Sequence, residues 1–363
     1  MASAELGEML SSEDPELKVA ALLRCADAGL FDPPDLLCDC LSDRDALVRG
    51  TAAKAFTAAG TKAVPYMGKV SQLLTSSDVG AKCAAAEVLG AFAADAAPHA
   101  SAVAALLDDP AEDKMAVALM AGCNVTTGDA ARPKAAWRFP RAAAAEALPK
   151  LGADGRAFAA AVAKLLHDSV PEVRCVAVAS LGAMGMEGAA HEEAVLSLLT
   201  TERDPRVIAS VATSLAEMGK ARGCSNQPAM DAILRLLLSQ HPGVRAAAAG
   251  ALGSLGDAGS VHIAKLLRCL TDRSPQVKIA AISSIVALGP PGQVYAVDLC
   301  RLAVDEWQLP AVRASALDAL PLLGERGAAL AYEVAELLED PEEEVRFAAM
   351  RVLEIFSKGY GDV

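Results

Sequence analysis

The chain has 363 residues, of which 53% are hydrophobic and only 4% aromatic, and its formal net charge at pH 7 is −13. This acidity argues against general nucleic-acid binding, because such binding depends on Lys and Arg contacts with phosphates. The acidic start from Met1 to Glu16 does not resemble a secretory signal, and no run of about 18 apolar residues predicts a membrane-spanning helix. We therefore expect an intracellular, cytoplasmic protein that binds no nucleic acid and inserts into no membrane.

One sequence pattern recurs along the chain about every 33 residues. It can be aligned on a basic residue, and two degenerate copies have Asp113 and Ile208 at that position. A repeat of this length is typical of helical solenoids. The regular copies have the following basic residues: Lys18, Arg49, Lys82, Arg141, Arg174, Arg245, Lys278, Arg313 and Arg346.

Each copy contains the start and stop signals of one helix. A proline commonly precedes the basic residue by three positions, where a first helical turn needs no N–H donor. Residues that can cap this helix stand before several of these prolines, namely Asp14, Asp109, Asp204, Ser274 and Asp340. Large apolar residues follow the basic residue by seven positions, at Phe56, Leu89, Leu148, Leu181, Leu215, Leu252, Ile285, Leu320 and Leu353. Glycines that predict a left-handed helix stop follow it by eleven positions, at Gly29, Gly60, Gly152, Gly185, Gly219, Gly256, Gly289 and Gly324.

A second helix fills the gap before each of these helices. Residues 158–166, 230–238 and 261–270 have apolar side chains at spacings of three and four, which predicts one inward-facing stripe. One helix pair cannot bury such a stripe alone, whereas stacked pairs can. The sequence therefore predicts an all-α, right-handed α-α superhelix of about ten to eleven helical hairpins. We expect a single solenoid over residues 1–363, with an irregular segment at 125–140.

The repeat pattern resembles the HEAT repeat. The motif is Asp-x-x-Val-Arg-x-x-Ala-x-x-x-Leu-Gly, and residues 173–185 and 244–256 match it best. The short form of the repeat is similar to that of the phycobilisome-lyase type, and the resemblance extends over roughly residues 12 to 357. It implies the fold. It implies no single function, because the family includes scaffolds, transport receptors, assembly factors and a few enzymes.

The recurrent arginines are predicted to form a structural ladder. A catalytic residue would occur once, whereas these occur in successive repeats and can pair with acids at neighbouring helix starts. The ladder residues are Arg49, Arg174, Arg245, Arg313 and Arg346.

The repeat loses its register between Asn124 and Arg141. This stretch contains four basic residues and two aromatic ones. One interpretation is a contact site for an acidic or phosphorylated segment of a protein partner. The alternative is that Trp137 and Phe139 only fill the seam between two repeats. The candidate partner-binding residues are Arg132, Lys134, Trp137, Arg138 and Phe139.

A second candidate surface lies on the helices that carry the basic residues. Positions one residue and about five residues after the basic one are small and largely uncharged, which favours a groove for a partner helix or an extended peptide. An alanine-rich composition explains the same pattern. Examples are Gly50, Ala55, Cys83, Val88, Cys175, Ala179, Ala246, Gly250, Ile279 and Ser283.

No catalytic constellation is recognisable. The five histidines lie in different repeats, and His191-Glu192 alone resembles the His-Glu pairs of the HEAT-like iron hydroxylases. The nine cysteines are scattered, which suits a reducing compartment, and Cys38-x-Cys40 is the closest pair. We therefore expect no catalytic residue, no metal and no cofactor. The predicted function is a non-catalytic protein–protein interaction scaffold or adaptor, and the alternative left open is an enzyme or enzyme subunit of the HEAT-like bilin-lyase kind.

Overall fold

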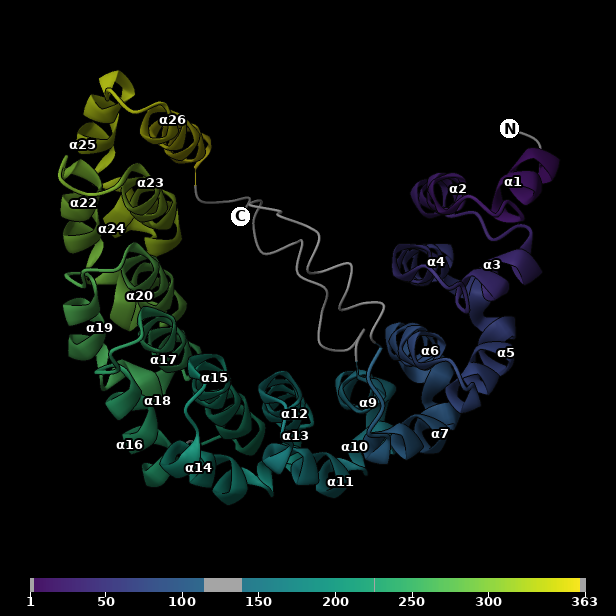
Figure 1. The fold of residues 1–363 in the computed structure, drawn as a ribbon. Helices are drawn as coiled ribbons and strands as arrows, with labels where there is room; N and C mark the ends of the chain where they lie inside the picture. Colours follow the sequence, from purple (N-terminus) through teal and green to yellow (C-terminus); the bar gives the residue numbers. More distant parts are fainter. Residues whose placement is uncertain (1–2, 114–138, 225, 360–363) are drawn as a thin grey trace. The chain divides into compact units, whose positions relative to one another are not determined.

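The computed structural model describes residues 3–113, 139–224 and 226–359. All regular secondary structure in these ranges is helical, which confirms the predicted all-α solenoid class. The chain divides into two compact units, residues 1–194 and 195–363, with the boundary inside α14 (Glu192–Thr201). Each unit has two layers of helices (Figure 1). The single continuous solenoid stays a prediction.

In the first unit, the helices that carry the basic residues form one layer and pack against each other in chain order. They are α2 (Pro15–Ala28), α4 (Ala46–Ala59), α6 (Val79–Ala91), α9 (Pro140–Ala147) and α12 (Pro171–Ala183). The remaining α-helices are α1 (Ser3–Leu10), α3 (Pro34–Cys40), α5 (Met67–Gln72), α7 (Ala100–Ala104), α10 (Gly152–Arg156), α11 (Ala159–Lys164) and α13 (Gly185–Ala189). Short 3-10 helices are η1 (Gly60–Tyr66), η2 (Leu73–Thr75), η3 (Ala93–His99), η4 (Ala105–Asp108), η7 (Leu148–Leu151) and η8 (Leu165–His167).

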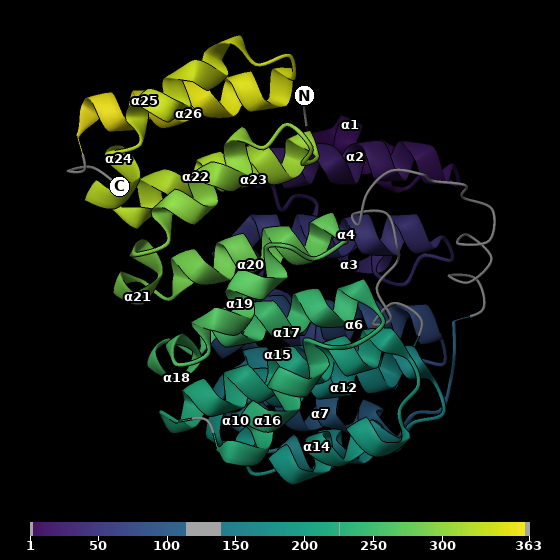
Figure 2. The same cartoon turned by 90° about the vertical axis from the view of Figure 1, so that its left-hand side faces the viewer.

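The second unit repeats this arrangement. Its first layer is α15 (Pro205–Arg222), α17 (Pro242–Ser254), α20 (Pro275–Ala287), α23 (Pro310–Ala319) and α26 (Glu343–Lys358). The other helices are α16 (Gln227–Leu236), α18 (Asp257–Ser260), α19 (Ile263–Cys269), α21 (Pro290–Gln293), α22 (Ala296–Val304), α24 (Glu325–Ala328), α25 (Ala331–Glu336), η9 (Leu320–Leu323) and η10 (Leu337–Glu339). Figure 2 shows α20, α23 and α26 lying side by side, as their packing contacts require.

The predicted inward positions form the core. The apolar residues seven positions after the basic one have no exposed surface from Phe56 to Leu320. Leu353, in the last described helix, is half-buried.

Part of the predicted groove was wrong, because five of its residues are buried. Gly50, Cys83 and Ala246, each directly after a basic residue, are buried. Ala55 and Val88 have no exposed surface. They lie six residues after Arg49 and Lys82, one position too far around the helix to reach solvent.

The predicted helix starts are correct in part. The carboxylates of Asp14 and Asp204 cap α2 and α15 by accepting the N–H of Glu16 and Arg206. Ser274 occupies the N-cap position of α20 as predicted, but its side chain makes no capping hydrogen bond. Asp340 lies two residues before the N-cap of α26, and its carboxylate accepts the N–H of Glu342 instead.

The positions of the predicted glycine stops are confirmed with one exception, whereas their predicted left-handed helical conformation is confirmed only in part. Gly219 is a buried residue inside α15, and the helix ends one turn later at Gly223, where φ is +73°. The other predicted stops have positive φ. Several of them are not left-handed helical, however. Gly60 and Gly256, for example, have ψ of −131° and −125°, in a region that residues with a Cβ rarely adopt.

A second glycine, three residues after the stop, was not recognised from the sequence. At Gly259 a Cβ would lie 1.9 Å from the carbonyl oxygen of Leu252, the buried residue of the preceding helix. The chain therefore turns tightly enough that only hydrogen fits. The same contact of 1.8 to 2.0 Å recurs at Gly155, Gly188, Gly292 and Gly327.

Candidate functional site

Several of the basic residues join one hairpin to the next through a carboxylate that lies 25 or 27 positions further along the chain. In α17, Arg245 donates from Nε and Nη2 to the two carboxylate oxygens of Asp272, both at 2.8 Å. Its Nη1 donates to the carbonyl oxygens of Ser239 and Gln240, at 2.7 and 3.1 Å. Asp272 in turn accepts the backbone N–H of Ser274. One guanidinium thus fixes its own interhelix loop and the loop of the next hairpin.

Equivalent rungs occur elsewhere in both units. Those in the first are Lys18–Asp43 at 2.5 Å, Lys82–Asp109 at 2.7 Å and Arg141–Asp168 at 2.7 Å. In the second unit Arg313 pairs with Asp340, and both side chains are at most 4% exposed. Arg174 and Arg346 donate from Nη1 to the backbone carbonyl oxygens of Asp168 and Asp340. The charged ends of these ladder side chains therefore bind other groups of the same chain.

The ladder carboxylates are held in their charged form. Burial alone would raise the pKa of Asp168, but hydrogen bonds from Arg141 and from the N–H of Val170 bring this pKa below its ordinary value. The pKa of Asp272 is lowered first by the hydrogen bonds from Arg245, against the opposing effect of burial. The same rung raises the pKa of Arg245. Each rung is therefore a charged pair at neutral pH.

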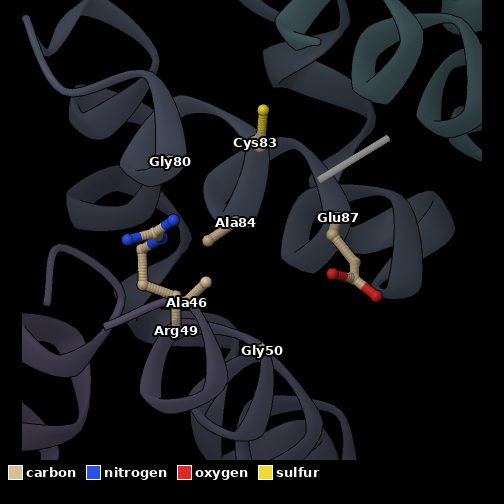
Figure 3. A pocket seen from close by; sticks show the side chains of 7 residues that line it. All are labelled: Ala46, Arg49, Gly50, Gly80, Cys83, Ala84 and Glu87. Carbon is tan, nitrogen blue, oxygen red and sulfur yellow. The ribbon is translucent and has the colours of Figure 1, made fainter. Parts of the chain in front are cut away.

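Arg49 forms an unusual rung in the first unit. The residue 27 positions after it is Ser76, and Arg49 pairs instead with Asp113, which occupies the basic position of a degenerate copy. The guanidinium passes over Gly80, where a Cβ would lie 2.2 Å from Cζ of Arg49. Figure 3 shows Arg49 beside Gly80 and Ala84 in a shallow hollow between α4 and α6. Cys83 lines this hollow, and burial raises the pKa of its thiol, which disfavours the nucleophilic thiolate.

The outer surface of the first-layer helices is where the repeats differ. The residue five positions after the basic one is exposed or half-exposed in each described helix of this layer. We call these ten residues the exposed row. It comprises Leu23, Lys54, Glu87, Glu146 and Ala179 in the first unit and Thr213, Gly250, Ser283, Asp318 and Arg351 in the second. Core and ladder positions are nearly constant, whereas the row changes in size and charge. Its central members in the second unit are small and uncharged.

The predicted partner-binding segment falls mostly outside the described residues. Arg132, Lys134, Trp137 and Arg138 lie outside them, and Phe139 is 3% exposed as the N-cap residue of α9. The guanidinium carbon of Arg141 lies 4.9 Å from the centroid of the Phe139 ring. Phe139 itself therefore has the buried position that the seam-filling interpretation expects of it.

The cysteines do not form a site in the described ranges. Cys38 and Cys40 are each 3% exposed on α3, and burial raises the pKa of both thiols to about 11. Every described cysteine is free, and no cluster of three or more potential metal ligands occurs among the residues that the structure describes. Within the same residues no helix is long and apolar enough to cross a membrane.

The stacked hairpins, with ladder, buried leucines and glycine turns, define an α-solenoid protein. Residues 192–286 match the family model described as HEAT repeats. Among curated proteins, none matches this chain in sequence.

Solved structures similar to this chain include karyopherins. The Kap95:Nup1 complex has a TM-score of 0.59 at 14% identity, covering 99% of this chain and 54% of the other. Kap121p bound to Nup53p has a TM-score of 0.54 at 13% identity, covering 99% and 45%. The chain thus spans about half the length of these proteins, and the likeness concerns the fold alone. A chain in the complex of CpcE and CpcF of phycocyanin lyase from Nostoc sp. PCC7120 has a TM-score of 0.44 at 19% identity, covering 80% and 94%, and this score carries no weight for function.

Proposed function

We propose that this protein is a non-catalytic interaction scaffold that binds protein partners through the exposed row. The observation that carries the proposal is the contrast between constant and variable positions. The ladder and core side chains stabilise the stack in each repeat, while the row varies in size and charge along the chain. Stacked repeats generally use such extended surfaces for binding.

The second unit offers the most open part of this surface. A Cβ added at Gly250 would meet no other atom within 4 Å, and Ser283 and Thr213 are exposed on the flanking helices. A partner helix or extended peptide can approach the backbone closely where side chains are this small. Support also comes from the karyopherins of similar fold, whose structures were solved with Nup1 or Nup53p. An acidic or phosphorylated partner segment at residues 132–138 remains part of the proposal, as does an intracellular, cytoplasmic location, which the free cysteines support.

The experiment captures protein partners by cross-linking them to the purified chain. The partners captured by the wild type are then compared with those captured by variants of the exposed row. Gly250→Arg and Ser283→Arg add bulk and charge to the row without disturbing buried atoms. Ala264→Arg is the matched control, because Ala264 is exposed on α19 in the other layer. We expect the two row variants to lose a partner that the control keeps, at equal melting temperature. Unchanged capture by the row variants would refute the exposed row as the binding surface, and a shift in a bilin's absorption spectrum on mixing would favour a lyase subunit instead.

A further inference from the structure

The loop between α22 and α23 departs from the other interhelix loops of the ladder. From the ladder aspartate to the next basic residue there are six positions in the regular cases, such as Asp168 to Arg174 and Asp272 to Lys278. From Asp305 to Arg313 there are eight. This loop is therefore two residues longer. We call residues 305–309 the long loop.

The extra length changes how the loop is held. Arg49, Arg174, Arg245 and Arg346 each donate from Nη1 to carbonyls five and six positions earlier. Arg313 donates from Nε to the carbonyl oxygen of Ala303, ten positions earlier and before the long loop begins. The Nε hydrogen bond from Arg313 therefore ends before the long loop, whereas the regular loops accept hydrogen bonds from their arginines directly.

The long loop is nevertheless well ordered by its own hydrogen bonds. The carboxylate of Asp305 accepts the N–H of Trp307 at 3.1 Å and the side-chain amide of Gln308 at 2.7 Å. The side-chain oxygen of Gln308 accepts from the ammonium of Lys278 in α20. These bonds, that from Gln308 first, lower the pKa of Asp305, so the turn is fixed around a charged carboxylate.

This fixed turn presents an apolar patch to solvent. Trp307 is 96% exposed and Leu309 57%, and Val304 at the end of α22 is 40% exposed. Isolated exposed apolar residues are common, but tryptophan is among the residue types most enriched in binding hot spots, and here it stands on a hydrogen-bonded turn. Because the turn is already ordered, binding would cost little conformational entropy.

Acidic side chains outnumber basic ones around the patch, although Arg273 before α20 and Arg301 in α22 are also exposed. Glu306 is exposed within the long loop, and the neighbouring loop before α26 adds exposed Glu339, Glu342, Glu343 and Glu344. One side chain joins the end of α22 to this loop, since Arg313 contacts both Ala303 and Asp340. The nearby cations Lys278 and Arg313 are engaged by Gln308 and Asp340. The surroundings would attract a cation and repel a phosphate.

We infer that the long loop binds an extended, Arg- or Lys-rich protein segment, with a cationic side chain over the indole of Trp307 and an aliphatic one against Leu309. The indole face attracts cations, and the surrounding carboxylates strengthen that attraction. This inference rests on the proposed scaffold function and adds a second binding surface, apart from the exposed row, with partner chemistry opposite to that proposed for residues 132–138.

The test uses a synthetic peptide in which Arg alternates with Leu and Ser, and a control peptide with Glu in place of Arg. The chain has two tryptophans, so the Trp137→Phe variant leaves Trp307 as the sole indole reporter. We expect saturable quenching or a shift of its emission with the Arg peptide. Raising the salt from about 0.1 M to about 1 M should weaken binding, because the Debye length falls from about 10 Å to about 3 Å.

Variants decide whether Trp307 is responsible. By anisotropy of the labelled peptide, Trp307→Ala should bind about tenfold more weakly. Glu306→Lys should also weaken binding, whereas Tyr332→Ala, which removes a 76% exposed aromatic from α25, should not. The inference is overturned if Trp307→Ala binds the Arg peptide as tightly as the wild type does. It is also overturned if the wild type binds the Glu peptide as tightly as the Arg peptide. Concentration-dependent self-association in sedimentation velocity that Trp307→Ala abolishes overturns it too, since the occupant is then a second copy.

The two proposals fail separately. Loss of peptide binding with capture of partners through the exposed row intact removes the long-loop site and leaves the scaffold. Peptide binding without any row-dependent partner removes the exposed row and leaves the long loop as the recognition surface.

Discussion

The junctions between successive hairpins are built in two ways. In the later part of the first unit, and in the second unit after α17, a glycine pair spaced by three begins a short α-helical turn, as in α18 and α21. In the earlier junctions the second glycine is replaced by buried Ala63 and Ala96, and the chain follows the 3-10 helices η1 and η3. Where alanine replaces the second glycine, the backbone therefore forms a 3-10 helix instead of a short α-helical turn. The overall repeat tolerates both.

The ladder rungs also differ from one another, and both units contain arginine rungs. The earlier rungs include Lys18–Asp43 and Lys82–Asp109, in which a single ammonium contacts the carboxylate and the lysine side chains are 19% exposed. The later rung Arg313–Asp340 uses a two-pronged guanidinium with both side chains nearly inaccessible to water. A repeat can thus be held by a solvated point charge or by a buried, directional pair, and these should not contribute equally to stability.

The largest expected effect separates the two kinds of rung. Asp340→Ala leaves the guanidinium of Arg313 buried without a counter-charge, which should destabilise the protein by about 3–5 kcal/mol. Asp43→Ala leaves the better solvated Lys18, and the expected loss is about 1 kcal/mol or less. Urea denaturation of both variants gives the comparison. Equal losses would mean that burial of the rung is unimportant.

The next effect concerns the glycine pair. Gly259→Ala places a methyl group against the carbonyl oxygen of Leu252, and the required backbone shift should cost about 2–3 kcal/mol. The matched change in an early junction, Ala63→Gly, should cost only about 1 kcal/mol, from added chain entropy and a lost buried methyl. If Gly259→Ala loses less than about half a kcal/mol, the later junctions can rewind as the early ones do, and the glycine is not required.

Acid should weaken the rungs in a defined direction. The folded-state pKa of Asp272 is lowered, chiefly by Arg245, so its contribution is fully present above the unfolded pKa and is lost as pH falls through the folded one. Asp168 and Asp340 act in the same sense. The melting temperature should therefore fall below about pH 4. Asp272→Asn should flatten part of that fall; a decline as steep as that of the wild type would assign the acid sensitivity to other groups.

The sequence predicted the framework because the framework repeats. Proline, the inward leucine and the stop glycine recur at fixed spacing, so each copy supports the others and the errors are local. Gly219 was assigned as a stop because it has the right spacing, but α15 continues for one more turn to Gly223. Ser274 has a capping side chain, yet its backbone N–H is the group that forms a hydrogen bond, to Asp272. Such choices depend on neighbouring contacts.

The candidate surfaces were harder to predict because they do not repeat. Arg49 passes over Gly80 to reach Asp113, a partner 64 positions away that no periodic rule indicates. The long loop could have been found from the sequence, since the interval from Asp305 to Arg313 exceeds that from Asp272 to Lys278 by two residues. The exposure of Trp307 could not have been predicted from the sequence, because tryptophan side chains are often buried in protein cores.

The smallest expected effect is a gain in stability at an early junction. Ala93 occupies the stop position of its repeat with φ of +47°, where the other confirmed stops have glycine. This conformation costs an L-residue about 1–2 kcal/mol, a strain that glycine avoids. Glycine loses more conformational entropy on folding, however, which offsets about 0.5–1 kcal/mol of that gain. Because Ala93 is exposed, no buried methyl is lost. Ala93→Gly should therefore stabilise the protein by up to about 1 kcal/mol. Ala179→Gly, at an exposed position inside α12, is the control and should destabilise by about 1 kcal/mol. Both are measurable by urea denaturation, and a loss of stability in Ala93→Gly would show that the early junction is not strained at its stop.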